Sequence, residues 1–100
     1  MHLLIVEFDL QGLDATDYEA VADDLTPTFA AVPGLLTKTW IADRDTGSAG
    51  SVYVWESAAR CDAFLAGDLF AAMRTNPALA NLRTRRYDVV GVTAPEPAVA

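Results

Sequence analysis

The sequence predicts an α+β domain of the ferredoxin-like kind, with element order β-α-β-β-α-β, a four-stranded antiparallel sheet and two helices on one face. Four segments have the alternating or continuous apolar pattern of strands, and two others carry apolar residues at helical spacing. A short polar loop separates the two middle strands, which is typical of a hairpin. One hundred residues suit one such domain.

The first predicted strand covers residues 2–10, and the first helix follows it. Thr16 and Glu19 have the spacing of a capping box at the start of this helix, and Asp14 is a competing cap. Pro27 lies inside the helical pattern. Because proline removes a backbone donor and clashes with the preceding turn, we expect a kink or a break there.

A Pro-Gly pair stops the helix, and predicted strands 35–42 and 51–56 follow on either side of the polar loop. Lys38 and Trp40 lie two residues apart on the first of these strands, so their side chains share a face. A charged amine beside an indole in mid-strand is unusual if that face is buried. This pair is therefore the first candidate for function.

Ser57 is the predicted cap of the second helix, which divides where Asp68 caps a second piece. The last strand is predicted over residues 82–92. We expect a single domain over residues 1–93. Residues 94–100 contain two prolines and no periodicity, which predicts a flexible C-terminal tail.

Two helices can cover only one face of a four-stranded sheet. The other face would then carry aliphatic and aromatic side chains from several strands, and an exposed apolar patch of that size needs a partner or a ligand. Pairing two such sheets face to face would cover this apolar patch. We therefore expect a homodimer.

The composition excludes several classes of partner. A net charge of -7 opposes binding to nucleic acid and to anionic membrane surfaces, and no apolar run approaches the length of a membrane span. One cysteine and one histidine cannot form a usual zinc site, so no metal site is predicted. We expect a cytoplasmic protein, because one cysteine allows no intrachain disulfide.

Two motifs in the middle of the chain combine turn, strand and aromatic residues. They are Pro33-Gly34-Leu35-Leu36-x-Lys38-x-Trp40 and Gly50-x-Val52-Tyr53-x-Trp55-Glu56-Ser57. In these motifs the chain resembles the mono-oxygenases of the YdhR type, in the dimeric α/β-barrel superfamily that also holds antibiotic-biosynthesis mono-oxygenases. The resemblance extends to about Val92. Thr37 stands where that family often has an aromatic residue, and Ser51 replaces the more usual second glycine.

The resemblance implies a dimeric α/β barrel with a pocket in each subunit between sheet and helices. It also implies oxidation of an aromatic or polycyclic small molecule by O₂ without metal, flavin or haem, so no cofactor is expected. The alternative is a non-catalytic small-molecule-binding or stress-associated homodimer on the same fold. An isomerase or lyase on this scaffold is a third possibility.

Lys38 and Glu7 are the catalytic candidates. Lys38 could hold an anionic substrate oxygen, or act as a base if desolvation lowers its pKa. It could equally form an ion pair with Glu7 or Glu56, or be an edge-strand lysine that blocks aggregation of the sheet. His2, the single histidine, is a further candidate base.

The predicted substrate-binding residues are Trp40, Tyr53, Trp55, Tyr87 and Arg85. For the aromatic residues among them, the alternative is packing in the core or at the dimer interface. Arg83, Arg85 and Arg86 resemble an anion site, but in an acidic protein such residues more often pair with carboxylates.

Overall fold

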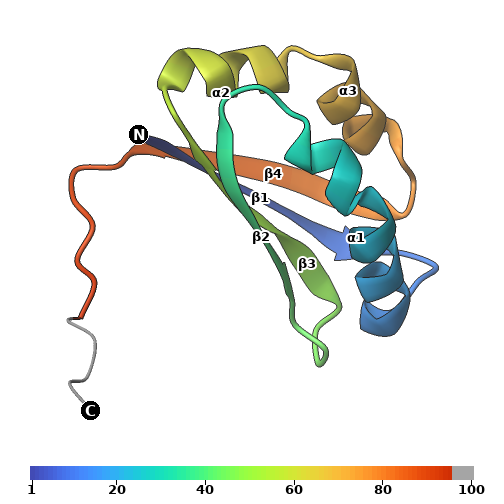
Figure 1. The fold of residues 1–100 in the computed structure, drawn as a ribbon. Coiled ribbons are helices and arrows are strands. Elements are labelled where there is room, and N and C mark those ends of the chain that lie inside the picture. Colours follow the sequence, from blue (N-terminus) through green and yellow to red (C-terminus); the bar gives the residue numbers. More distant parts are fainter. Residues whose placement is uncertain (96–100) are drawn as a thin grey trace.

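The computed structural model describes residues 1–95 and shows one antiparallel sheet with all helices on a single face (Figure 1). In chain order the elements are β1 (His2–Leu10), α1 (Ala15–Ala30), β2 (Leu35–Ala42), β3 (Ser48–Trp55), α2 (Ala58–Leu65), α3 (Asp68–Thr75) and β4 (Leu79–Asp88). The strand order is β2-β3-β1-β4, and each neighbouring pair is antiparallel. The predicted ferredoxin-like fold is confirmed. The second helix is divided in two as predicted, but Gly67, not Asp68, is the N-cap of the second piece.

The core lies between the sheet and the helices. Leu4, Val6 and Phe8 of β1 point toward the helices and are at most 3% exposed, while the alternate residues Leu3 and Ile5 are half-buried on the opposite face. This alternation is the period of a strand with one covered face. The core is completed by the aromatic residues Tyr53, Trp55, Phe29, Phe64 and Phe70.

The N-cap of α1 lies two residues earlier than the predicted Thr16. Asp14, the competing candidate, is the N-cap: its side chain accepts a hydrogen bond from the Asp17 backbone N–H (2.9 Å), and the Asp17 side chain accepts one from the Asp14 N–H (3.0 Å). The reciprocal pair is a capping box formed by two aspartates. This start places Ala15 and Tyr18 on the buried side of the helix.

Pro27 does not interrupt α1, so the predicted break is wrong. The proline lies in the last turns, where it removes a single intrahelical hydrogen bond. Thr26 donates its hydroxyl to the Ala22 carbonyl (2.8 Å) inside the helix. Phe29, buried against the sheet beyond the proline, holds the final turn in place.

Strand β4 begins and ends earlier than the prediction of 82–92. Its ends follow β1, since Leu79 pairs with Leu10 and Asp88 pairs with His2. The pairing shifts register between Glu7 and Asp9, beside Asn81 with its positive φ of 55°. The length of β4 is therefore set by its neighbour in the sheet.

The second face of the sheet carries no helix (Figure 1). Ile41 and Tyr87 are 40% and 51% exposed there, beside half-buried Leu3, Val52 and Val54. Residues 89–95 follow β4 without regular structure, and the rest of the predicted tail lies outside the described residues. Within residues 1–95, no helix is long and apolar enough to cross a membrane.

Candidate functional site

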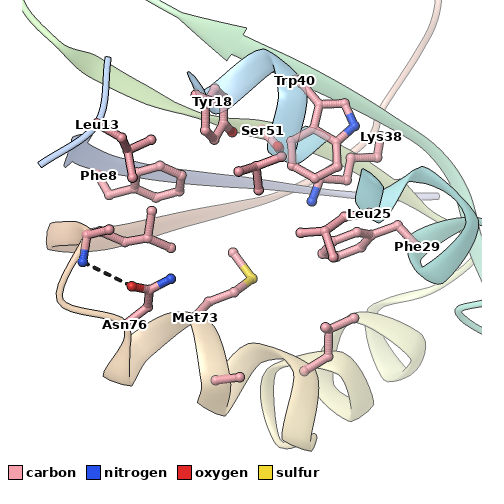
Figure 2. Close-up of a pocket in the computed structure, with 15 residues that line it drawn as sticks. Phe8, Leu13, Tyr18, Leu25, Phe29, Lys38, Trp40, Ser51, Met73 and Asn76 are labelled. Carbon is pink, nitrogen blue, oxygen red and sulfur yellow. Dashed lines mark hydrogen bonds between the residues drawn. The ribbon is translucent and has the colours of Figure 1, made fainter. Parts of the chain in front are cut away.

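A cavity of about 250 Å³ lies between the sheet and helices α1 and α3 (Figure 2). Its walls are mainly aliphatic and aromatic, with Phe8 and Trp40 from the sheet, Phe29 from α1 and Met73 from α3. Val21, another lining residue, is 42% exposed, so the cavity opens to solvent beside α1. A concave, mainly apolar cavity with few polar groups is the usual form of a small-molecule site.

Lys38 supplies the amine of this cavity. Its Nζ lies 3.1 Å from the centre of the Phe29 ring and 3.4 Å from that of Trp40, and the side chain points into the cavity (Figure 2). Among the described residues, no carboxylate lies within ion-pair distance of this amine. Lys38 is therefore a half-buried base without a counter-charge among the described residues.

Removal from water lowers the pKa of Lys38 to about 6. The ring faces act in the opposite direction, because they attract an ammonium group by roughly 0.5–2 kcal/mol. Losing the hydration of a buried charge costs several kcal/mol, which is the larger effect. The amine is consequently neutral in a large share of molecules at pH 7.

The two ion pairs considered for Lys38 are both wrong. Glu7 points to the uncovered face of the sheet and pairs with Arg83 (3.6 Å), and Glu56 pairs with Arg60 (3.9 Å). The alternation of β1 places Glu7 opposite the helix-facing residues of the same strand. The structure therefore separates the two catalytic candidates, with only Lys38 at the cavity.

The predicted substrate-binding residues divide into three places. Trp40 lines the cavity. Tyr53 and Trp55 are fully buried, with their rings stacked 6.0 Å apart, and are not among the lining residues. Arg85 and Tyr87 lie on the uncovered face of the sheet, on the same side as the residues opposite them in β1, Ile5 and Leu3.

His2 lies at the end of β1 away from the cavity residue Phe8. Its Nδ1 is 3.0 Å from an Asp88 carboxylate oxygen, and Arg86 donates to its Nε2 (3.1 Å). Arg86 also pairs with Asp62 of α2 (2.6 Å). This network, in which only His2 is buried, links the first strand to the last strand and to α2.

The three arginines do not form one anion site, because Arg86 lies on the opposite face of the sheet from Arg83 and Arg85. Arg83 pairs with Glu7 and Asp9 on the uncovered face, whereas Arg86 points toward the helices. Cys61 is fully buried in the core.

Residues 3–95 match the family described as "Putative mono-oxygenase ydhR". The chain belongs to this family. No protein of curated function shows significant sequence similarity to this YdhR-family chain.

Solved structures share the fold of this YdhR-family chain at low sequence identity. The heme-degrader MhuD from Mycobacterium tuberculosis, with two hemes bound, has a TM-score of 0.75 and 18% identity over 94% of this chain and 100% of MhuD. SnoaB from Streptomyces nogalater, a cofactor-independent oxygenase, has a TM-score of 0.68 and 22% identity over 91% and 94%. The ActVA-Orf6 mono-oxygenase of Streptomyces coelicolor, in complex with Nanaomycin D, has a TM-score of 0.68 and 21% identity over 94% and 91%.

Haem does not fit the YdhR-family cavity as it stands. A haem iron is held by a histidine, cysteine, methionine or tyrosine side chain. His2 and Cys61 lie elsewhere, and the Tyr18 hydroxyl is engaged by a backbone carbonyl. Met73 does line the cavity, but a methionine ligand of haem iron is paired with a histidine, which the cavity lacks. A volume of about 250 Å³ is also too small for a tetrapyrrole. Within residues 1–95 no group of three metal-binding side chains occurs.

Tyr18, Ser51 and Asn76 are polar residues of the cavity wall that the sequence did not indicate. Tyr18 donates its hydroxyl to the Gly50 carbonyl (2.7 Å) and so ties α1 to β3. Ser51 occupies the position of the family's second glycine and is buried, which adds a hydroxyl to the wall. The one available signal was this departure from the family motif at Ser51.

Tyr18 in the cavity wall and Tyr53 in the core provide a matched pair of tyrosine variants. Tyr18→Phe is expected to lower the free energy of unfolding by about 1 kcal/mol, because it leaves the buried Gly50 carbonyl without this donor. Tyr53→Phe is expected to be neutral or stabilising, since the buried Tyr53 hydroxyl has no hydrogen-bond partner among the described residues. Urea denaturation of both variants measures the difference, and equal losses would contradict these assignments.

Proposed function

We propose that the protein is a cofactor-independent mono-oxygenase that oxidises an aromatic small molecule with O₂. The observation that carries the proposal is the Lys38 amine, which lies without a counter-charge in an apolar cavity with aromatic walls. Such a cavity admits a flat apolar substrate and excludes water. A desolvated amine can take a proton from a phenol near neutral pH.

The chemistry can be written for 1-naphthol as substrate. Lys38 Nζ takes the hydroxyl proton, and the naphtholate has carbanion character at the carbon para to the oxygen. That carbon gives electrons to O₂ and forms a C–O bond, and the Lys38 ammonium protonates the resulting peroxide. Loss of water then gives 1,4-naphthoquinone, so one O₂ is consumed and one water released. The protein supplies the base and a dry, aromatic cavity.

The volume of the cavity limits the size of the substrate. An apolar cavity of about 150 Å³ accepts benzene, so about 250 Å³ accommodates roughly two fused rings. Phe29 and Trp40 present their faces around Lys38 and would stack on such a substrate. Larger polycycles would need the mouth beside Val21 to widen.

Oxygen uptake by the purified, metal-free protein tests the proposal. We expect saturable uptake with 1-naphthol, and slower uptake with dihydroxy-anthracenes, above the rate of autoxidation. Lys38→Met is expected to lower kcat at least about 100-fold, the usual range for loss of a general base, while quenching of tryptophan fluorescence by the substrate persists.

The control is Arg74→Met, which removes an exposed cation from α3. It is expected to leave uptake unchanged. An unchanged rate in Lys38→Met would exclude the proposed role of the amine. Quenching without uptake in the unmodified protein would favour the alternative, a small-molecule-binding protein that does no chemistry.

We also propose a cytoplasmic homodimer in which the uncovered faces of two sheets pack together. The apolar residues Leu3, Val52 and Val54 on this face support the proposal, since no helix within residues 1–95 covers them. In this assembly Arg85 and Tyr87 lie at the interface, on the opposite side of the sheet from the cavity of their own subunit. They could contact a substrate only if it were bound by the partner subunit.

Val52→Asp is expected to convert the dimer to monomer, because it would bury a charge without a partner at the interface. Ala63→Asp, on the exposed side of α2, is the control and is expected to leave the dimer intact. Sedimentation equilibrium at micromolar concentration measures both masses. A one-chain mass for the unmodified protein would contradict the dimer.

A further inference from the structure

We propose that Lys38 is also a nucleophile, and that the cavity binds small aromatic aldehydes covalently as imines of its Nζ. This reaction needs no oxygen and is therefore independent of the proposed oxidation. It assigns the cavity a second class of ligand, aromatic carbonyl compounds, in addition to phenols.

The first support is the position of the amine. Nζ lies over the faces of Phe29 and Trp40 with the cavity in front of it, so a flat ring that enters would bring a substituent to the nitrogen (Figure 2). The ring of Tyr53, 4.7 Å from Nζ, closes the side toward the core. The amine is held against apolar groups on the inside and faces the cavity, and the half-buried Lys38 side chain also borders a shallower pocket beside Thr26 and Leu36.

The second support is the absence of groups that would hold the amine as an ammonium ion. Among the described residues that line the cavity, only Tyr18 and Lys38 carry a titratable side chain. The Tyr18 hydroxyl is engaged by the Gly50 carbonyl, and burial raises its pKa, so it stays neutral at pH 7. A lysine desolvated in an apolar pocket is the form of this residue that attacks carbonyl groups.

The covalent step is balanced by loss of water. The lone pair of neutral Nζ adds to the aldehyde carbon, the two amine protons leave with the carbonyl oxygen as water, and a C=N bond replaces C=O. No oxidant or cofactor is required. Because burial lowers the pKa of Lys38 to about 6, the nucleophilic form is available at pH 7, and an apolar cavity favours release of the water to solvent past Val21.

The sequence makes this inference unusually easy to test, because Lys38 is the only lysine among the 100 residues. The one other amine is the chain's N-terminus. Trypsin cuts after an unmodified Lys38 and yields a peptide of residues 1–38. An alkylated Lys38 resists trypsin, so the modified chain yields a peptide of residues 1–44 in its place.

The experiment incubates the protein with 2-naphthaldehyde and sodium cyanoborohydride at pH 7, which reduces an imine to a stable secondary amine. We expect one naphthylmethyl group per chain and the 1–44 peptide. Labelling of Lys38 is expected to be at least about tenfold faster than in the urea-unfolded chain, where an ordinary lysine is almost fully protonated. Naphthalene, which fills the cavity without reacting, is expected to slow it.

Lys38→Arg and Lys38→Met are expected to lose this label while they retain the circular dichroism spectrum of the folded protein. The proposal is overturned if the label is found only at the N-terminus, or if Lys38 reacts no faster in the folded than in the unfolded chain. Labelling at Lys38 without oxygen uptake from 1-naphthol would sustain this inference and reject the oxygenase. Oxygen uptake from 1-naphthol without labelling at Lys38 would reject the imine and leave the oxygenase standing.

Discussion

Lys38→Met is expected to stabilise the protein at pH 7 and to remove a pH dependence of its stability. The pKa of Lys38 is about 6 in the folded state and near 10.5 in the unfolded chain. Between these values the unfolded chain holds one more proton, so the free energy of unfolding rises with pH. One proton gives a slope of at most about 1.4 kcal/mol per pH unit, and the slope disappears below pH 6, where both states are protonated.

Methionine fills similar volume without a charge to desolvate, so the variant lacks this slope. At pH 7 we expect it to be more stable than the unmodified protein by about 2 kcal/mol or more. Urea denaturation from pH 6.5 to pH 9, at one fixed protein concentration because of the proposed dimer, measures the difference. Tyr18 and Tyr53 do not interfere, because burial raises the pKa of each above that range.

Lys38→Arg is the control, since arginine keeps its charge at every pH tested. It is expected to be less stable than Lys38→Met throughout. Parallel curves for the unmodified protein and Lys38→Met would show that the amine does not lose its proton on folding. The base and the nucleophile proposed for the cavity would then both be unsupported.

Gly50→Ala is expected to prevent folding or to lower the free energy of unfolding by more than about 4 kcal/mol. A methyl group at Gly50 would overlap the Val6 carbonyl oxygen and lie 3.0 Å from the Glu7 Cα. Gly50 pairs with Glu7 on one side and with Ile41 on the other. The overlap is with backbone in the centre of the sheet, so strands would have to separate to relieve it.

Gly91→Ala is the matched control, because a methyl group there meets nothing within 4 Å. It is expected to change stability by less than about 0.5 kcal/mol, as is usual for a surface substitution. Thermal melts followed by circular dichroism distinguish the two variants. A folded Gly50→Ala with nearly unchanged stability would mean that β1 and β3 are not held in the register described.

The features that depend on local pattern could be predicted from the sequence. Residues 2–10 alternate with the period of a strand, and Leu4 and Val6 are buried as that period requires. Ser57 caps α2 through its hydroxyl, which accepts from the Arg60 N–H. The ends of β4 could not be predicted, because pairing with β1 sets them.

The candidate site was predictable in part for the same reason. The alternation of side chains along a strand places Lys38 and Trp40 on one face. An unpartnered charge beside an indole marks that face as unusual. The alternation does not show which face of each strand the helices cover. The sequence therefore could not show that Glu7 and Tyr87 lie on the opposite face of the sheet from Lys38. Tyr18 has the spacing of an ordinary core residue, and only the packed structure places its hydroxyl against Gly50.

Because β1 lies between β3 and β4, the first strand of the chain can complete its hydrogen bonds only when the last strand arrives. The β2–β3 hairpin joins neighbouring segments and closes a short loop, whereas β1 and β4 come from opposite ends of the domain. Contacts between distant segments slow folding. We therefore expect the hairpin to form early in refolding, and docking of β4 to limit the rate. Until that step, one edge of the apolar strand β1 is open to other chains.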